Sequence, residues 1–205
     1  SFVGMQPIPV VYGMTIGEYA KMLVGENWLQ TKSKVKLEVV PCLNYQHDSK
    51  IVLTIPPSPN LKSSQAIALY PSLCLFEGTG VSVGRGTETP FECYGSPFLN
   101  KQVLKDSFKP ISRKGASSPP FLNQWCFGEQ MSEIKVVEKF DLSYILKAYQ
   151  HWTRDKKEFF LPSLFFDNLA GNATLRWQIM NGKTENEIRE SWYSDIKKKK
   201  KIRVK

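Results

Sequence analysis

The side chains best suited to chemistry gather in one glycine-rich stretch, LFEGTGVSVGRGTETPFECYGSPFL, at residues 75–99. It places carboxylates at Glu77 and Glu92 and a guanidinium at Arg85, with serine and threonine hydroxyls between them. Glycine permits positive φ angles and lets the backbone approach a ligand closely. This combination is typical of a polar-ligand site. The alternative is an ordinary turn region in which Arg85 forms an ion pair with Glu77 or Glu92.

Known nucleotide-binding loops do not fit this stretch. A Walker loop ends in Gly-Lys-Ser/Thr, whereas here Arg85 follows Gly84 and Gly86 comes next. The dinucleotide fingerprint G-x-G-x-x-G opens a helix, whereas Gly78 and Gly80 are followed by glycine only at position 84. The sequence therefore does not favour a loop that cradles phosphate groups.

Local patterns predict a mixed α/β (α+β) fold around the glycine-rich stretch. A capping box of Thr15 and Glu18 opens a helix that ends at Gly25, and Thr184 with Glu187 opens the last helix. An apolar run at residues 73–76 predicts a strand that delivers Glu77 to the site. The other predicted helices cover residues 63–70, 99–107, 142–152 and 172–181, and the other predicted strands cover residues 35–40 and 133–140.

The positive charge of the chain is concentrated at its C-terminus. The formal net charge is +9, but residues 197–205 hold seven basic and no acidic side chains. Residues 1–196 therefore carry 21 basic and 19 acidic side chains, a net charge of only +2. A lysine run at the end of a helix is usually a solvated face that complements the helix dipole. Nucleic-acid binding is not favoured, whereas weak attraction to an anionic cell-wall or membrane surface is consistent with this tail.

The sequence predicts neither a metal site nor a cofactor. No two cysteines have the C-x-x-C spacing of a zinc site, and the chain holds only two histidines. His47 stands beside Asp48 in a polar stretch, where it is either a base or a surface histidine. An even number of cysteines would allow a disulfide, but the pairing cannot be read from their positions, which are Cys42, Cys74, Cys93 and Cys126.

Four blocks of sequence, taken in order, carry a resemblance to a known family. They are SFVGMQPIPVVYGMTIGEYAKML from residue 1, PPSPNLKSSQAIALYPSLCLFEG from residue 56, EGTGVSVGRGTETPFE with GSPFL from residue 77, and FDNLAGNATLRWQI with ENEIRESW from residue 166. Together they resemble the exo-β-N-acetylmuramidase family of the NamZ type. The resemblance implies a bacterial glycosidase that releases N-acetylmuramic acid from the non-reducing ends of peptidoglycan fragments.

Members of that family are about twice as long as this chain, which resembles their second half. The resemblance implies that residues 1–205 form a single C-terminal α+β domain, with the active cleft against a Rossmann-like N-terminal domain absent from this chain. A start at Ser1 rather than Met is expected for a fragment or a processed chain. The resemblance also implies an exported protein, periplasmic or extracellular, although no signal peptide is visible in the sequence.

Within this resemblance, Glu77 and Glu92 are the expected catalytic residues. Glycosidases generally use two carboxyl groups, one that protonates the leaving oxygen and one that acts as nucleophile or base. Glu77, after its apolar run, is expected to be partly desolvated and to act as the acid, with Glu92 in a supporting or base role. A 2-acetamido substrate could instead supply its own nucleophile, and one catalytic carboxylate could lie in the absent half.

The substrate-binding residues expected from the motif are Arg85, Ser82, Thr79, Thr87 and Asn60. A guanidinium can bind the lactyl carboxylate of N-acetylmuramic acid through two hydrogen bonds, which predicts that role for Arg85. The expected partners are peptidoglycan-derived sugars and the N-terminal domain of the same protein. A second function stays open: a non-catalytic module that binds muramic sugars, or that completes a cleft whose catalysis belongs to another domain.

Overall fold

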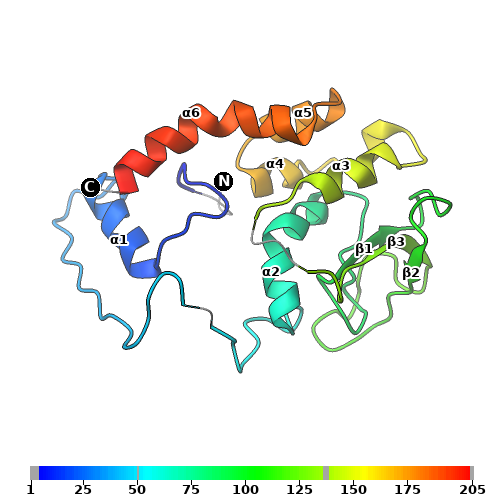
Figure 1. Cartoon of the computed structure of the whole chain (residues 1–205), viewed down its shortest axis with the longest axis horizontal. Helices are drawn as coiled ribbons and strands as arrows, with labels where there is room; N and C mark the ends of the chain where they lie inside the picture. The colour runs from blue at the N-terminus through cyan, green and yellow to red at the C-terminus, as the bar shows by residue number, and fades with distance from the viewer. Residues whose placement is uncertain (1–4, 50, 136–138, 204–205) are drawn as a thin grey trace.

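Figure 1 shows the computed structural model, which describes residues 5–49, 51–135 and 139–203. The fold is mixed α/β, as the sequence predicts. Strands β1 (Cys93–Ser96), β2 (Asp106–Phe108) and β3 (Cys126–Gln130) form an antiparallel sheet in the order β1-β3-β2. The helices are α1 (Ile16–Gly25), α2 (Ser64–Leu73), α3 (Ser143–Gln150), α4 (Phe165–Ala170), α5 (Thr174–Met180) and α6 (Glu185–Arg203), with the 3-10 helices η1 (Cys74–Gly78) and η2 (Lys156–Glu158).

The main apolar core lies between the sheet, η1 and the helices α2 to α6. At its centre the Phe76 ring of η1 stacks on the Tyr94 ring of β1, with the ring centroids 4.8 Å apart and both side chains fully buried. Each of the helices α3 to α6 adds buried apolar side chains, among them Ile145, Phe166, Leu175 and Ile188. The core therefore holds η1, the element that carries Glu77.

Gly78 ends η1 and allows α4 to pack directly against it. A Cβ atom at this position would lie 2.4 Å from the backbone N and Cα of Phe166, closer than real Cβ contacts. Backbone hydrogen bonds hold the start of the glycine-rich stretch in the same region: Gly80 N donates to Phe159 O at 2.8 Å, and Leu161 N donates to Gly78 O at 3.0 Å. The Glu77 side chain therefore leaves a backbone that is fixed from two sides.

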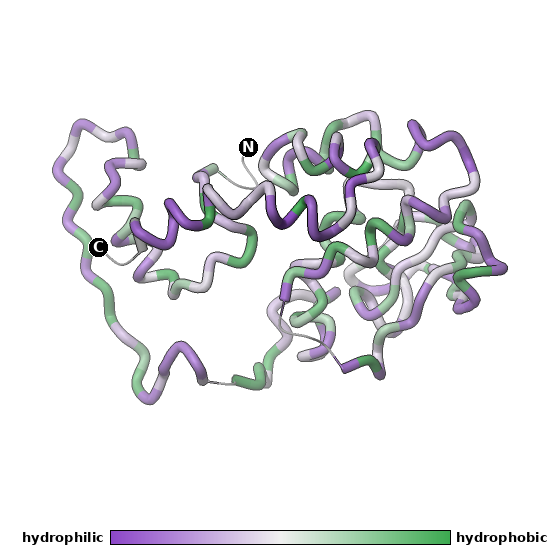
Figure 2. Tube along the Cα trace, turned by 45° about the horizontal axis from the view of Figure 1, so that its top comes forward, coloured by the Kyte–Doolittle hydropathy of each residue, from purple (hydrophilic) through white to green (hydrophobic). Residues whose placement is uncertain are grey.

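The N-terminal segment lies apart from this core. None of residues 5–49 and 51–59 is buried, and the apolar side chains of Ile16, Val40 and Leu43 are at least 82 % exposed. Figure 2 shows apolar and polar stretches alternating along this segment, which leaves the body of the molecule and returns to it at α2. Helix α6 reaches across to the segment (Figure 1), where Lys199 Nζ lies 4.9 Å from the centre of the Trp28 ring. Among the described residues, no helix combines the length and hydropathy of a membrane span.

Two helices begin where their capping patterns predict. Before α1, Thr15 Oγ1 accepts from Glu18 N at 3.1 Å, while Thr15 N donates to Glu18 Oε2 at 2.7 Å. Before α6, Thr184 N donates to Glu187 Oε2 at 2.8 Å, and Glu187 N donates to Thr184 Oγ1 at 3.3 Å. The predicted helices at residues 63–70, 142–152 and 172–181 correspond to α2, α3 and α5.

Other predicted elements differ from the structure. Residues 73–76 end α2 and begin η1 instead of forming a strand, because a short apolar run suits a buried helical turn equally well. Residues 35–40 form no strand, since no described segment pairs with them. Residues 99–107 form turns that lead into β2 rather than a helix. Within the predicted strand at 133–140, residues 136–138 lie outside the described residues, and the remainder is irregular.

Candidate functional site

The glycine-rich stretch turns back on itself so that Arg85 meets Glu77. Gly84 and Gly86, on either side of Arg85, adopt positive φ angles of 74° and 84°, which glycine takes without strain. The guanidinium donates to Glu77 Oε1 from Nε at 2.9 Å and from Nη2 at 2.6 Å. It also lies 5.1 Å from the centre of the Phe91 ring. Of the two ion pairs left open by the sequence, the structure forms the one with Glu77.

Glu77 and Arg85 border a cavity of about 230 Å³, termed here the Glu77 cavity. Thr79 and Ser82 line it too, but their hydroxyls also hold the loop: Thr79 Oγ1 donates to Phe76 O at 2.8 Å, and Ser82 Oγ accepts from Gly84 N at 3.2 Å. The glycine-rich stretch therefore lines a cavity. The rest of the wall is mainly apolar and consists of Phe76, Gly80, Val81, Val83, Pro120, Phe121 and Leu161.

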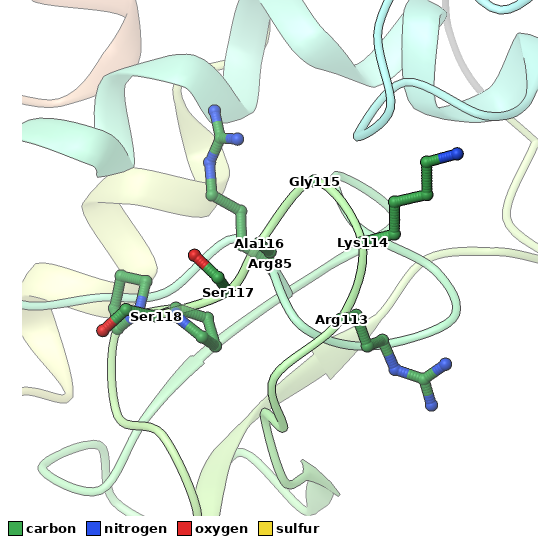
Figure 3. A pocket seen from close by; sticks show the side chains of 9 residues that line it. Arg85, Arg113, Lys114, Gly115, Ala116, Ser117 and Ser118 are labelled. Carbon is green, nitrogen blue, oxygen red and sulfur yellow. The ribbon is translucent and has the colours of Figure 1, made fainter.

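A larger cavity of about 440 Å³ adjoins the first and shares Arg85 and Pro120 with it. All its ionisable lining residues are cations, namely Arg85, Arg113 and Lys114, and it is termed the cationic cavity. Figure 3 shows that the loop of residues 113–120 forms its wall, with Arg85 and Lys114 on either side of the loop tip at Gly115. The site therefore combines a cavity bordered by a carboxylate with a neighbouring cavity bordered by positive charge.

Three of the predicted site residues line neither cavity. Glu92 is buried and accepts a hydrogen bond from the Ser63 hydroxyl, whose oxygen also caps α2. Thr87 Oγ1 donates to the backbone of the glycine-rich stretch at 2.7 Å. Asn60 Nδ2 donates to Gly115 O at 3.0 Å, which joins the chain just before α2 to the tip of the 113–120 loop. Through these contacts the three residues can support the cavity walls. Their direct contact with substrate stays a prediction.

Sequence reasoning did not select Tyr70, Arg113 or Lys114 for the site. The Tyr70 ring lies 5.1 Å from the Phe91 ring, and its pKa is raised by burial and, to a smaller extent, by the nearby Cys74 and Glu77. Its contact with Phe91 depends on how the glycine-rich stretch folds over α2, which no local pattern reveals. For Arg113 and Lys114 a signal exists in the sequence, because adjacent cations stand within a loop rich in proline, serine and glycine.

The described residues contain no group of three or more histidine, cysteine or acidic side chains that could hold one metal ion. Burial raises the pKa of the Cys74, Cys93 and Cys126 thiols to about 12 in each case. These thiols are therefore protonated at neutral pH and are poor nucleophiles and ligands. His47 Nε2 lies 2.8 Å from Glu18 Oε1 on α1, and this histidine lines neither cavity.

Comparisons with known proteins point to one family. The model for the C-terminal part of the exo-beta-N-acetylmuramidase NamZ matches residues 68–205, and the model for its N-terminal part matches residues 1–65. The two matches meet at the start of α2, where the apolar core also begins. The treatment of residues 1–205 as one C-terminal domain stays a prediction.

Individual relatives agree with this family. The peptidoglycan beta-N-acetylmuramidase NamZ of Bacillus subtilis is 31% identical over 224 residues, a match that covers 100% of this chain and 52% of the relative. The crystal structure of a DUF1343 family protein of Bacteroides fragilis superposes with a TM-score of 0.92 at 43% identity, covering 100% of this chain and 57% of the other. A second DUF1343 family protein of that organism gives a TM-score of 0.71 at 20% identity, covering 96% of this chain and 56% of the other. This likeness shows the fold alone.

The chain thus spans about half the length of these relatives. Its two matches to the family models together account for nearly every residue. The chain belongs to the exo-β-N-acetylmuramidase NamZ family.

Proposed function

We propose that the full-length protein carrying this chain is an exo-acting β-N-acetylmuramidase, which releases N-acetylmuramic acid from the non-reducing ends of peptidoglycan fragments. The observation that carries the proposal is the Glu77 carboxylate in the wall of one cavity, directly beside a cavity lined by cations. The activity in the name of the Bacillus subtilis relative supports the same substrate class.

In this proposal Glu77 acts as an anion rather than as the proton donor expected from the sequence. Arg85 forms an ion pair with Glu77, an arrangement that suits a carboxylate acceptor. Both hydrogen bonds from Arg85 reach Oε1, and Oε2 takes part in neither of them. Oε2 is therefore available to stabilise positive charge that develops on the sugar, or to act as a base or nucleophile. The proton for the leaving oxygen must come from another group, which we place in the N-terminal half.

A second function has an observation of its own. Among the described residues, Glu77 is the one carboxyl group that lines either cavity, whereas glycosidases generally use two. If both catalytic carboxyl groups belong to the N-terminal half, this chain is a module that binds muramic sugars and completes the cleft.

The N-terminal segment fits a protein whose other half covers it. We propose that its exposed apolar side chains, such as Val40 and Leu43, pack against the N-terminal half in the full-length protein. We also propose an exported protein, because a periplasmic or extracellular location would bring it to its substrate. Fractionation of cells that express the full-length protein tests this location.

The experiment that tests the proposed function is an incubation of the full-length protein with peptidoglycan fragments that begin with N-acetylmuramic acid, followed by mass spectrometry. We expect free N-acetylmuramic acid, released once per fragment, while fragments that begin with N-acetylglucosamine stay intact. Binding of the muramic-ended fragments without any release would reject the glycosidase in favour of the binding module.

A further inference from the structure

Lys114 provides the cationic cavity with a positive charge that no acidic side chain among the described residues pairs with. Arg85 is paired with Glu77, and Arg113 Nη1 lies 2.5 Å from Glu88 Oε1. Within the described part of the chain, Lys114 forms neither an ion pair nor a hydrogen bond through its side chain, and no acidic residue lines the cavity. The cavity therefore attracts an anion, and Lys114 is the cation available to meet it.

Hydrogen bonds within the chain hold the loop that carries this lysine in place. Arg113 and Ala116 exchange backbone hydrogen bonds of 3.1 and 2.9 Å, which close a tight turn. At the tip, Gly115 has a φ angle of 84° and accepts the hydrogen bond from Asn60. Arg113 Nε also donates to Gly86 O at 3.2 Å, which joins the loop to the glycine-rich stretch. Because the loop is already ordered, an anion that binds there costs little backbone entropy.

The direction of the side chains selects Lys114 over Arg113. In Figure 3, Arg85 and Lys114 extend on either side of the loop tip toward the same edge of the view, whereas Arg113 extends the opposite way. The cationic cavity shares Arg85 with the Glu77 cavity. A sugar ring beside Glu77 could therefore direct a short charged substituent past Arg85 toward Lys114.

We propose that Lys114 is the residue that recognises the lactyl carboxylate of N-acetylmuramic acid, while Arg85 is committed to Glu77. This inference rests on the proposed function for the identity of the sugar. It replaces the expectation that Arg85 performs this recognition. A lysine ammonium is a compact charge on a flexible stem, which suits a single carboxylate on a short ether arm.

The test compares N-acetylmuramic acid with its lactyl methyl ester, in which a methyl group removes the negative charge, by titration calorimetry on the full-length protein. We expect the acid to bind about fivefold more tightly than the ester, the effect of roughly 1 kcal/mol from a partly exposed ion pair. Lys114→Gln should abolish this preference and Lys114→Arg should restore it. The matched control is Lys109→Gln, an exposed lysine that lines neither cavity, and it should keep the preference. Raising the salt concentration should weaken the preference in the unmodified protein.

A preference for the acid that survives in Lys114→Gln, or that is missing from the unmodified protein, would overturn the inference. Release of N-acetylmuramic acid, assayed on the same samples, separates this failure from a failure of the proposed function. If release persists while the variant still prefers the acid, the glycosidase stands and the role of Lys114 is rejected. If the preference depends on Lys114 but nothing is released, the role of Lys114 stands and the protein is a binding module.

Discussion

The exposure and geometry of the ion pair between Glu77 and Arg85 indicate its coupling energy. The two side chains are 23% and 32% exposed, and one carboxylate oxygen receives two guanidinium N–H groups. Hydrogen bonds to charged groups contribute about 1.5–3 kcal/mol when buried, whereas exposed ion pairs contribute about 0.2–1 kcal/mol. For a pair that is mostly but not fully buried, we expect a coupling energy of about 1–2 kcal/mol.

A double-mutant cycle measures this coupling. The free energy of urea unfolding would be determined for the full-length protein, for Arg85→Ala, for Glu77→Ala and for the double variant. The control cycle uses the exposed pair Arg154–Glu158, whose side chains are 50% and 46% exposed and which should couple by only about 0.3–0.5 kcal/mol. A coupling of Glu77 with Arg85 no larger than that of the control pair would refute the reasoning.

The same pair makes a kinetic prediction. Because Arg85 is engaged with Glu77, Arg85→Lys should lower turnover of a muramic glycoside and of its lactyl methyl ester by the same factor. The measurement is kcat and KM for both chromogenic glycosides. A rise in KM confined to the free acid would instead place Arg85 on the lactyl carboxylate and contradict the role assigned to Lys114.

Three further changes test the framework around the site. Ser63→Ala removes both the cap of α2 and the partner of Glu92, so the free energy of unfolding should fall by about 1–3 kcal/mol in urea titrations, while kcat of the folded protein stays near normal. Gly78→Ala places a Cβ 2.4 Å from the backbone of α4, so we expect the free energy of unfolding to fall by at least about 2 kcal/mol and Glu77 to be displaced. An unchanged thermal unfolding midpoint would contradict the close packing. The pKa of Glu187 is lowered from 4.5 to about 2, mainly by the hydrogen bond from Lys183. The contribution of this carboxylate to stability is therefore present above pH 4.5 and is lost as the pH falls through 2. An NMR titration midpoint near 4.5 would contradict this.

The parts of the fold that the sequence predicted are those set by local chemistry. Thr15 and Thr184 predict helix starts correctly because the capping hydrogen bonds join residues only three positions apart. The strand predicted at residues 73–76 was wrong because a strand and a helical turn can both bury such an apolar run. Its packing against α4 decides between them. The strand predicted at residues 35–40 failed since a strand needs a partner, and no described segment supplies one.

The candidate site was located from the sequence but not resolved by it. Glycines around Arg85 indicated a loop that could bend back, and in the structure Glu77, Thr79, Ser82 and Arg85 border one cavity. Their roles toward substrate stay predictions. The choice of Glu77 as the partner of Arg85 depends on two positive φ angles that no composition reveals. Lys114 lies 29 residues beyond Arg85 in the numbering of the chain and reaches the same region only because the 113–120 loop folds back along the glycine-rich stretch.

The central claim, that Glu77 takes part in the chemistry, is tested most directly by kcat of Glu77→Gln in the full-length protein on a chromogenic muramic glycoside. Glutamine keeps the size of the side chain and an oxygen for Arg85 but removes the negative charge. The control is Glu190→Gln, an exposed carboxylate on α6 that lines neither cavity. The account predicts that kcat falls by roughly 10² or more in Glu77→Gln, with unchanged circular dichroism, while the control keeps full activity. A near-normal kcat in Glu77→Gln would contradict the account and assign the chemistry to the N-terminal half.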